Sequence, residues 1–410
     1  MKKLIYCSVL LCLMTACQTG NGVKEPKHLY LSPQEKQMVN HCNDFSFNLL
    51  TQVAANEQSE NVILSPLSAS MLIGMLMNGA DGETLEQMQQ VTGFAGAQQD
   101  EINDYYHKLI DVLPALDTET KVKLANGIWM VESYPFKPEF AEVCKQAFEA
   151  EVKNVPTFLD DNVLKDINRF AADNTENKIK EVVKRDMVNS ETIMVLANAL
   201  YFKGKWKDQF KKTATRNRTF TTLQGAEIQT PMMHRTDMMS YAEGEDFQMA
   251  ELPYKGNKYC ADIILPAKGV DVRALADDLD AERWQQILDS RWEPEVELAL
   301  PKFTVKYSRD LTNDLKALGM PDALYVGADF SRLTDNDCHV DLIMQDCFMQ
   351  LDEEGTEAAA VTIGFMKNDA APGPSDYRQM IVDRPFILVL REKDYGTILF
   401  TAMIGHPQTN

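Results

Sequence analysis

The apolar run from Ile193 to Phe202, inside ETIMVLANALYFKGKW, constrains the fold more than any other stretch of this sequence. A strand on the surface alternates apolar and polar residues, because only one of its faces is buried. A run that is almost continuously apolar is typical of a strand covered on both faces. We therefore predict that this run is the central strand of a large sheet.

The order of the other predicted elements indicates an α+β protein. Ser65 precedes Pro66, so a buried helix can begin there with a serine cap and proline in its first turn. Further helices are predicted over 33–55, 83–91, 101–112, 138–149 and 163–183, and strands over 61–64, 121–130, 218–223, 249–256, 259–266, 296–307 and 385–405. Helices concentrate in the first half and strands in the second, which is unlike a βαβ repeat.

The composition is that of an ordinary globular protein. The chain has 410 residues, of which 45% are hydrophobic and 25% are charged. No low-complexity linker or internal repeat marks a domain boundary. We therefore expect one large domain over residues 33–410.

The first residues have the pattern of an export signal. Lys2 and Lys3 precede an apolar run, Leu4 to Met14, that is too short to span a bilayer. Small residues then lead to Cys17, which resembles a bacterial lipoprotein cleavage and lipidation site. Residues 1–16 are the predicted signal peptide, and 17–32 a polar tether; simple secretion with cleavage nearby is the alternative. We expect an outer-membrane lipoprotein that faces the periplasm or the cell surface.

Cysteine usage and charge exclude several classes of protein. Apart from Cys7, Cys12 and Cys17 in the export signal, the chain has an odd number of widely scattered cysteines: Cys42, Cys144, Cys260, Cys338 and Cys347. They imply neither a disulfide framework nor a zinc site. The formal net charge of -20 argues against nucleic acid and against a glycosaminoglycan-type surface, and is compatible with cationic partners.

No catalytic motif stands out. The histidines are His28, His41, His107, His234, His339 and His406, with no HExxH motif or close pair. The sequence contains no GxSxG elbow, and no phosphate-binding glycine loop follows a strand. We therefore predict a protein that is not an enzyme and uses no metal or cofactor. A secreted hydrolase would need a nucleophile and base that no pattern reveals.

The stretch DEEGTEAAAVTIGFMKND, from Asp352 to Asp369, has mixed preferences. Thr356 could cap a helix, and the alanines that follow Glu357 are good helix formers. Gly355 precedes them, however, and the β-branched residues after them favour a strand. The segment is suited to more than one conformation.

Several motifs together resemble the serpin family. EEGTEAAAVT resembles the hinge of the serpin reactive-centre loop, and it lies near the C-terminus as the family requires. Matching segments in the same order are NVILSPLSASMLIGMLMNGA, TENKIKEVV, NALYFKGKW with Phe210, LPKF, and DRPFILVLREKDYGTILFTAMIGHP. The resemblance covers the chain from Pro33 onward. It implies helices around a large mixed central sheet, smaller sheets, and an exposed reactive-centre loop over about 353–384.

The resemblance also implies the site residues. The loop hinge is Glu353, Glu354, Gly355, Thr356, Glu357, Ala358, Ala359 and Ala360. The bond that a protease cleaves falls in the window Phe365, Met366, Lys367, Asn368, Asp369 and Ala370. The family's usual spacing, counted from Glu353, places the cleaved bond at Asp369–Ala370. A loop two to four residues shorter on the hinge side would place it at a bond suited to trypsin-, elastase- or chymotrypsin-like enzymes. A polar cluster that holds the sheet strands is Ser65, Ser68, Asn198 and Gln345. Many members have histidine and lysine where this chain has Gln345 and Asp346.

The implied function is inhibition of serine endopeptidases, with cysteine endopeptidases as a second class. A target protease cleaves the loop, becomes covalently attached, and is trapped when the loop inserts into the sheet as a strand. Alternation would turn the small, uncharged residues Thr356, Ala358 and Ala360 inward and Glu357 outward. We expect a monomer with target endopeptidases as partners. The alternative is a non-inhibitory binding protein with the same fold.

Overall fold

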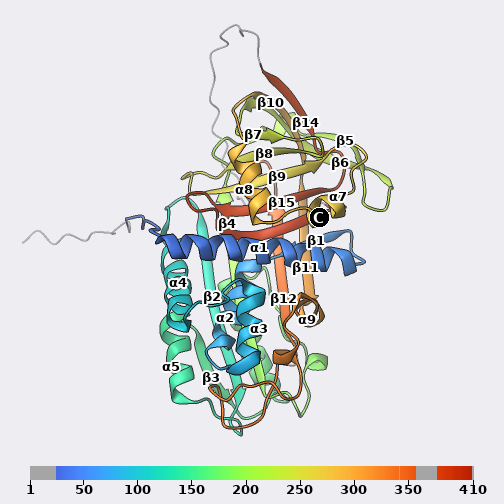
Figure 1. The fold of residues 1–410 in the computed structure, drawn as a ribbon. Coiled ribbons are helices and arrows are strands. Elements are labelled where there is room, and N and C mark those ends of the chain that lie inside the picture. Colours follow the sequence, from blue (N-terminus) through green and yellow to red (C-terminus); the bar gives the residue numbers. More distant parts are fainter. Residues whose placement is uncertain (1–24, 341, 357–375, 409–410) are drawn as a thin grey trace, which may run out of the picture.

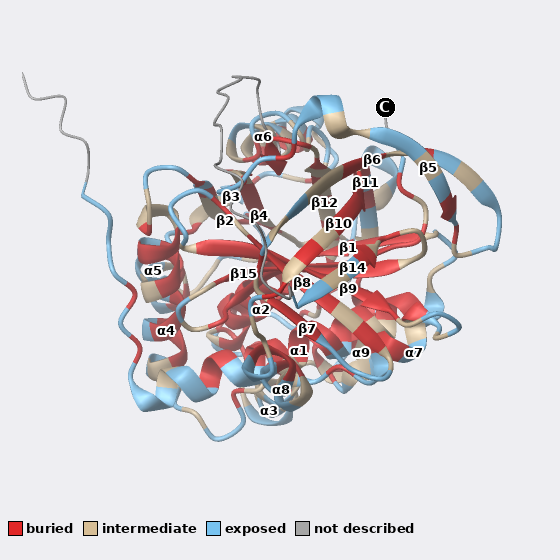
Figure 2. Ribbon diagram, turned by 90° about the horizontal axis from the view of Figure 1, so that it is seen from above, coloured by how far each residue is buried: buried red, intermediate tan, exposed pale blue. Residues whose placement is uncertain are grey.

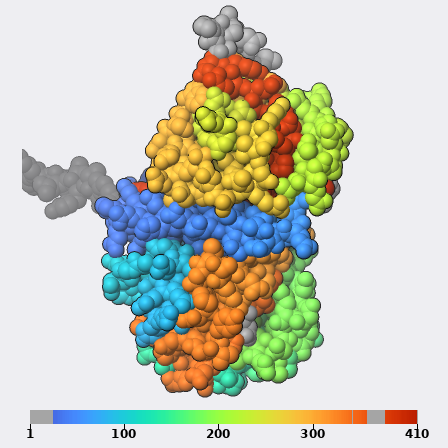
Figure 3. Space-filling model, turned by 45° about the vertical axis from the view of Figure 1, so that its right-hand side comes forward, coloured from blue at the N-terminus to red at the C-terminus, as the bar shows by residue number. Residues whose placement is uncertain are grey.

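The computed structural model describes residues 25–340, 342–356 and 376–408 (Figure 1). Its helices are α1 (Pro33–Asn56), α2 (Pro66–Met77), α3 (Gly82–Thr92), α4 (Gln99–Val112), α5 (Pro138–Ala147), α6 (Asp161–Asn174), α7 (Val272–Asp277), α8 (Ala281–Asp289) and α9 (Thr312–Leu318). Helix α1 crosses the middle of the molecule and forms a belt on its surface (Figure 3).

The described strands form three sheets, and the protein is α+β as predicted. The main sheet has the order β11 (Phe303–Asp310), β12 (Met344–Leu351), β13 (Gly355–Thr356), β4 (Met194–Lys205), β2 (Lys121–Val131) and β3 (Glu151–Val155). The second has the order β1 (Asn61–Leu64), β16 (Ile398–Ile404), β15 (Phe386–Glu392), β9 (Tyr259–Pro266), β8 (Phe247–Pro253) and β7 (Tyr241–Glu243). The third has the order β14 (Tyr377–Ile381), β10 (Glu295–Pro301), β6 (Glu227–Met238) and β5 (Arg216–Thr221).

Helix α2 begins as its sequence predicts. Ser65 is the N-cap, its hydroxyl accepts a hydrogen bond from the backbone N–H of Ser68, and Pro66 follows as the first helical residue. Every residue of α2 is buried, so the helix forms part of the core beneath the main sheet. Buried residues concentrate where such helices meet the sheets (Figure 2). In this way α2 brings Ser65 and Ser68 under the sheet.

Strand β4 is the predicted central strand. It pairs antiparallel with β2 from Met194 to Lys203. On its other side it pairs with β13, but only at Gly204 and Lys205. The remainder of that second edge, from Met194 to Lys203, has no strand partner among the described residues.

Among the described residues, the main sheet is therefore open at its centre beyond β13. Strand β13 is antiparallel to both β12 and β4, so β12 and β4 run parallel to each other. Thr356 of β13 pairs with Leu351 on one side and with Gly204 on the other. Beyond Thr356 no described strand lies between β12 and β4, and a strand that continued β13 between them would be antiparallel to both.

The predicted helix over 163–183 is too long. Helix α6 ends at Asn174, and Glu176 and Asn177 then adopt positive φ angles of 51° and 60°, which cannot continue a helix. The side chain of Asn168 supplies a competing set of hydrogen bonds. It accepts from the N–H groups of Val182 and Val183 and donates to the Val183 carbonyl, so it fixes the segment against α6.

Two further predictions need correction. The apolar segment 296–307 is two strands in two sheets, β10 and β11, which divide at Lys302. The last part of the predicted tether also contacts the folded body. Leu29 and Leu31 are buried, and the N–H of Lys27 donates to the Ala115 carbonyl at 2.7 Å.

The hydrophobic core lies between the helices and the sheets, and it includes buried cysteines. Large aromatic and aliphatic side chains fill the space between α1, α2 and the sheets. Cys42, Cys144, Cys260, Cys338 and Cys347 are free and buried. Across the described ranges, no helix is both long enough and apolar enough to pass through a bilayer.

Candidate functional site

The hinge enters the main sheet through backbone hydrogen bonds to the end of β4. The N–H of Trp206 donates to the Glu354 carbonyl at 2.8 Å, and the N–H of Phe210 donates to the Glu353 carbonyl at 3.0 Å. The indole N–H of Trp206 donates to the Asp352 carbonyl at 2.9 Å. The carbonyls of Asp352 and of the first two hinge residues, Glu353 and Glu354, therefore have fixed donors, and β13 begins directly after them.

Gly355 is required where β13 meets β4. Its φ angle is +155°, and a Cβ built on it would lie 2.0 Å from the carbonyl oxygen of Gly204 and 2.7 Å from the Cα of Lys205. Real Cβ atoms do not approach backbone this closely, and neither backbone can yield without breaking the pairing. Only glycine fits at the point where the hinge enters the sheet.

Thr356 points into the core. Its hydroxyl lies 2.5 Å from the hydroxyl of Tyr254, and both side chains are buried. The Tyr254 ring stacks on Trp206, with ring centroids 4.6 Å apart. Burial raises the pKa of Tyr254, so the phenol remains neutral. The tyrosine therefore provides Thr356 with a buried polar partner at the head of the gap.

Glu353 and Glu354 have charged partners, and Asp352, which precedes the hinge, is held by a backbone N–H group. Glu353 forms an ion pair with Lys302 at 2.7 Å and accepts a hydrogen bond from the Thr215 hydroxyl at 2.7 Å. Burial raises the pKa of the Glu353 carboxyl, but these hydrogen bonds outweigh burial, so its pKa lies below the usual range. Glu354 pairs with Lys212 at 2.6 Å. The Asp352 carboxylate accepts from the Glu354 N–H at 2.8 Å.

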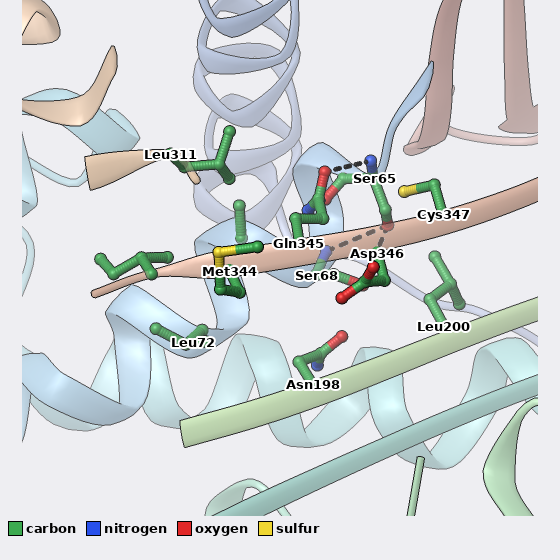
Figure 4. Close-up of a pocket in the computed structure, with 12 residues that line it drawn as sticks. Ser65, Ser68, Leu72, Asn198, Leu200, Leu311, Met344, Gln345, Asp346 and Cys347 are labelled. Carbon is green, nitrogen blue, oxygen red and sulfur yellow. Dashed lines mark hydrogen bonds between the residues drawn. The ribbon is translucent and has the colours of Figure 1, made fainter. Parts of the chain in front are cut away.

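Under the gap, Gln345 connects β12 to the start of α2 (Figure 4). Its carbonyl oxygen accepts from the Ser65 N–H at 2.9 Å, and its NH₂ group donates to the Ser65 carbonyl at 2.8 Å. The Ser65 hydroxyl donates to the Leu399 carbonyl at 3.0 Å and lies 2.9 Å from the Ser68 hydroxyl. Three of the four predicted cluster residues thus form one network, which also contacts β16.

Asn198, the fourth predicted residue, lies across the gap from this network (Figure 4). Its NH₂ group donates to the Asn126 side chain at 2.6 Å, and Asn126 in turn donates to the Phe148 carbonyl at 2.8 Å. The side-chain carbonyl oxygen of Asn198 is buried and has no hydrogen-bond partner among the described residues. A buried acceptor without a donor lowers the stability of the folded protein. A change that supplies this oxygen with a hydrogen-bond donor would therefore be stabilising.

Cavities lie on both faces of the gap. The inner cavity, of about 20 Å³, faces α2 and is lined by Ser65, Ser68, Ala69, Leu72, Asn198, Leu200, Leu311, Ile343, Met344, Gln345, Asp346 and Cys347. The outer cavity, of about 70 Å³, lies under the segment that follows α6. It is lined by Ala171, Thr175, Ile179, Val182, Val183, Met187, Val188, Thr192, residues 194–199, Leu342, Met344 and Asp346. Burial raises the pKa of Asp346.

The chain re-enters the described structure at Asp376, beside the third sheet. The indole N–H of Trp292 donates to the Asp376 carboxylate at 2.8 Å. Arg378 forms ion pairs with Asp376 at 2.6 Å and with Glu243 at 3.0 Å. Strand β14 then pairs parallel with β10. Both ends of the predicted loop are thus fixed, one in the main sheet and one in the third.

Several predicted site residues lie outside the described residues. These are Glu357 to Ala360 of the hinge, the cleavage window Phe365 to Ala370, and Cys17. Within the predicted loop range of 353–384, residues 355–356 and 377–381 are strands β13 and β14. Sequence analysis did not identify Tyr254, Trp206, Lys302 or Asn126. Trp206 and Lys302 lie in the motifs NALYFKGKW and LPKF, but nothing in these motifs indicates contact with the hinge, and no local motif marks Tyr254 or Asn126.

One cluster of described residues has the ligand types of a metal site. Glu251, Cys260 and Asp262 are buried and lie close together. Both carboxylates already pair with Arg391, at 2.8 Å and 2.7 Å. Arg391 supplies the positive charge that a cation would bring, so the cluster is better suited to an ion-pair network than to a metal.

A main sheet that is open between two parallel strands, with a hinge at the head of the opening, defines a class of α+β proteins that can accept an additional strand. The family model described as Serpin (serine protease inhibitor) matches residues 40–407. Human neuroserpin is 31% identical over 375 residues, which cover 89% of this chain and 91% of that protein. Serpin B6 of Pongo abelii is 33% identical over 374 residues, 88% of this chain and 97% of the other. The chain belongs to the serpin family.

Solved structures agree with this assignment. The native state of tengpin, a thermophilic serpin, superposes with a TM-score of 0.84 at 25% identity and covers 93% of this chain and 97% of its own. Thyroxine-binding globulin in complex with thyroxine has a TM-score of 0.81 at 24% identity, covering 91% of this chain and all of its own. The second likeness concerns the fold alone. The family is one of protease inhibitors in general rather than of enzymes, although that relative binds thyroxine.

Proposed function

We propose that this protein inhibits serine endopeptidases by a suicide-substrate mechanism in which its cleaved loop inserts between β4 and β12. The observation that carries the proposal is the open gap with β13 at its head. A protease that cleaves the loop within the window Phe365 to Ala370 becomes attached through an acyl bond. Insertion then carries the protease along. Displacing its catalytic groups by about 1 Å can slow hydrolysis roughly a hundredfold.

The pairing of β13 sets the register of the proposed inserted strand. Thr356 pairs with Leu351 and with Gly204, and the strand is antiparallel to both neighbours. Six residues further along the loop is Thr362, and six residues back along the neighbours are Gln345 and Asn198. In this register, Thr362 enters the sheet between the two polar residues that face each other across the gap.

The two cavities suit the side chains that this register assigns to them. Inward positions would place Ala360, Thr362 and Gly364 over the inner cavity, where residues such as Gln345 and Leu200 form the walls. Outward positions would place Val361 and Ile363 beside Ala197, Ala199, Met344 and Asp346, which line the larger outer cavity. Ala360, Thr362 and Gly364 would thus face the smaller cavity, and the larger apolar side chains of Val361 and Ile363 would face the larger one, as close packing requires.

The unpaired acceptor of Asn198 supports the same register. Its side-chain oxygen is buried without a donor, and the hydroxyl of Thr362 can supply one. About a dozen new backbone hydrogen bonds, at roughly 0.5 to 1.5 kcal/mol each, would add on the order of 10 kcal/mol. This gain is comparable with the stability of a whole domain, about 5 to 15 kcal/mol. Insertion can therefore drive the displacement of a protease.

A non-inhibitory binding protein is the second candidate. Thyroxine-binding globulin has the same fold and binds a small molecule. The hinge of the present chain favours the inhibitor, because Ala358, Ala359 and Ala360 are small and can enter a sheet without steric conflict. Bulky, charged or proline residues at these positions would have favoured the binding protein.

We further propose that the mature protein is a monomer attached to the outer membrane through a lipid on Cys17, facing the periplasm or the cell surface. The pattern of Lys2 and Lys3, the short apolar run and Cys17 supports this placement. The test is labelling with a radioactive fatty acid in a bacterial host. Label should appear in the wild-type protein and be absent from Cys17→Ser.

Incubation with proteases tests the inhibitory function directly. The mature protein is mixed with trypsin-, chymotrypsin- and elastase-type enzymes, and the products are separated on denaturing gels and weighed by mass spectrometry. We expect a covalent complex together with a released C-terminal peptide, whose mass identifies the cleaved bond. Cleavage without a complex in every case would reject the trapping mechanism and favour the binding protein.

A further inference from the structure

The outer cavity has a roof that other parts of the protein hold in place. The roof is the segment after α6, and Val182 and Val183 are two of its residues that line the cavity. The Asn168 side chain forms three hydrogen bonds with the backbone of these two valines. Leu342, another lining residue, is 37% exposed, so the cavity reaches the surface beside it. A preformed space that opens to solvent is typical of a ligand site.

The size and walls of the cavity suit a small organic molecule. Its volume is about 70 Å³, and one water-sized group needs roughly 10 to 15 Å³ of such space. The cavity therefore has room for about five non-hydrogen atoms. Apolar side chains such as Val183, Val195 and Ala197 form most of the walls. Most of a ligand that fills this space must accordingly be apolar.

One acidic side chain stands among these apolar walls. Asp346 is the only ionisable residue among the described residues that line the cavity. Ser308 and Lys184 stabilise its charged form, but no cation in the described part of the chain forms an ion pair with it. Burial raises the pKa of Asp346, because its charge is poorly solvated. A positively charged ligand would supply the partner that this carboxylate lacks.

Asn198 supplies a second polar group at the same place. Asn198, Met344 and Asp346 line both the inner and the outer cavity, so the two cavities meet at these residues. The side chains of Asn198 and Asp346 lie in the space between β4 and β12 (Figure 4). The Asn198 side-chain oxygen is buried and has no donor among the described residues. A primary ammonium group has one positive charge and three N–H donors, so it can bind both side chains.

We propose that the outer cavity binds a small primary ammonium ion with an apolar chain of about four carbon atoms. The ammonium group donates to the Asp346 carboxylate and to the Asn198 oxygen, and the chain fills the apolar space under the roof. A diamine would bury a second charge without a partner and is disfavoured. The proposed register gives the same space to Val361 and Ile363, so the ligand and the inserted strand exclude each other. Only this competition rests on the proposed function, because the ligand binds the uncleaved protein.

Binding of n-butylammonium to the mature, uncleaved protein tests the site. Isothermal titration calorimetry at neutral pH gives its Kd and stoichiometry. Three control probes change one property each: n-butanol lacks the charge, tetramethylammonium has a similar size but no N–H group, and 1,4-diaminobutane has a second charge. Asp346→Asn removes the carboxylate charge. Asp337→Asn is the matched control, since Asp337 is exposed and does not line the cavity. Melting curves verify that each variant is folded.

We expect one n-butylammonium ion to bind with a Kd of roughly 10 μM to 1 mM, because about five atoms cannot bind much more tightly. Each control probe should bind the wild type at least about tenfold more weakly, and Asp346→Asn should bind n-butylammonium at least about tenfold more weakly. Asp337→Asn should leave the Kd unchanged. No saturable binding in this range would overturn the proposal. Equal affinities for n-butylammonium and n-butanol, or equal affinities of the two aspartate variants, would also overturn it.

Trapping assays test the competition with the inserted strand. At a concentration of n-butylammonium that saturates only the wild type, the number of wild-type molecules consumed per trapped protease should rise. The same concentration should not affect Asp346→Asn, which controls for any action of the amine on the protease itself. Unchanged trapping by the saturated wild type would overturn the competition. Ligand binding by a protein that traps no protease under any condition would reject the proposed function and leave the site intact.

Discussion

The side-chain amide of Gln345 forms two hydrogen bonds with the backbone of one residue, Ser65. It accepts from the Ser65 N–H at 2.9 Å and donates to the Ser65 carbonyl at 2.8 Å. The two bonds connect β12, one wall of the open gap, to the N-cap of the buried helix α2. Serpins often have histidine here, and a glutamine satisfies the same backbone through both ends of its amide. We infer that the pair holds β12 in place while the sheet is open.

Gln345→Met tests this role, because methionine has a similar volume but cannot form either bond. The Ser65 N–H would remain buried without a partner, and the Ser65 carbonyl would keep only the Ala69 N–H, at a cost of about 2 kcal/mol. The midpoint of guanidinium unfolding of the uncleaved protein should fall accordingly. Gln350→Met is the control. Gln350 lies on the same strand, but its side chain is on the opposite face from that of Gln345 and is only half-buried. Equal effects of both variants would contradict the role of the Ser65 contact.

Thr356→Arg tests whether the hinge must bury its inward face. Thr356 contacts the buried hydroxyl of Tyr254, and an arginine there would place a charge in the core at a cost of several kcal/mol. The number of inhibitor molecules consumed per trapped protease should rise at least about tenfold, since a shift of about 1.4 kcal/mol already gives that factor. Glu357→Arg, at the next position on the expected outward face, is the matched control. Full trapping by Thr356→Arg would argue against insertion.

Thr362→Val tests the proposed register. In the loop-inserted form, valine would leave the Asn198 oxygen without its donor, which should lower the stability of the cleaved protein by about 1 to 2 kcal/mol. Thr362→Ser retains the hydroxyl and should behave much like the wild type. Guanidinium unfolding of the three cleaved proteins provides the measurement. If serine and valine are equally destabilising, Thr362 is not the partner of Asn198.

Asp346 should make stability depend on pH. Burial raises its pKa, while the Ser308 hydroxyl and Lys184 partly oppose this effect. A carboxyl group with a raised folded-state pKa stabilises most below its unfolded value of 3.8, and this stability is lost as pH rises through the folded-state pKa. Asp346→Asn should therefore melt at a higher temperature than the wild type at neutral pH. The difference should disappear below about pH 3.8. A difference that does not change with pH would exclude titration of Asp346 as its cause.

Local patterns account for the parts of the fold that sequence analysis predicted. The serine cap and proline at the start of α2 identify that helix, and the apolar run from Ile193 identifies β4 as central. The prediction that the helix continues over 175–183 was wrong because a tertiary contact fixes this segment in another conformation. Asn168, on α6, binds the backbone of Val182 and Val183, and no periodicity in the segment records that contact.

The candidate site was predictable to a similar degree. Its polar cluster could be named by resemblance, but the geometry showed that Asn198 bonds to Asn126 rather than to Ser65 or Gln345. The partners of the hinge, Tyr254 and Lys302, could not be found from sequence. Their contacts with Thr356 and Glu353 join segments far apart in the chain. Lys302 lies in the motif LPKF, but neither that motif nor the sequence around Tyr254 indicates these contacts.

The central claim is that the cleaved loop inserts between β4 and β12. Amide hydrogen exchange before and after loop cleavage tests it most directly. In the intact protein, N–H groups on the open edges of residues 194–203 and 344–350 should exchange quickly. After cleavage the inserted strand should protect them by several orders of magnitude, whereas β15 and β16 should change little. Unchanged exchange along both edges after clean cleavage would show that no strand enters the gap, and would contradict the account.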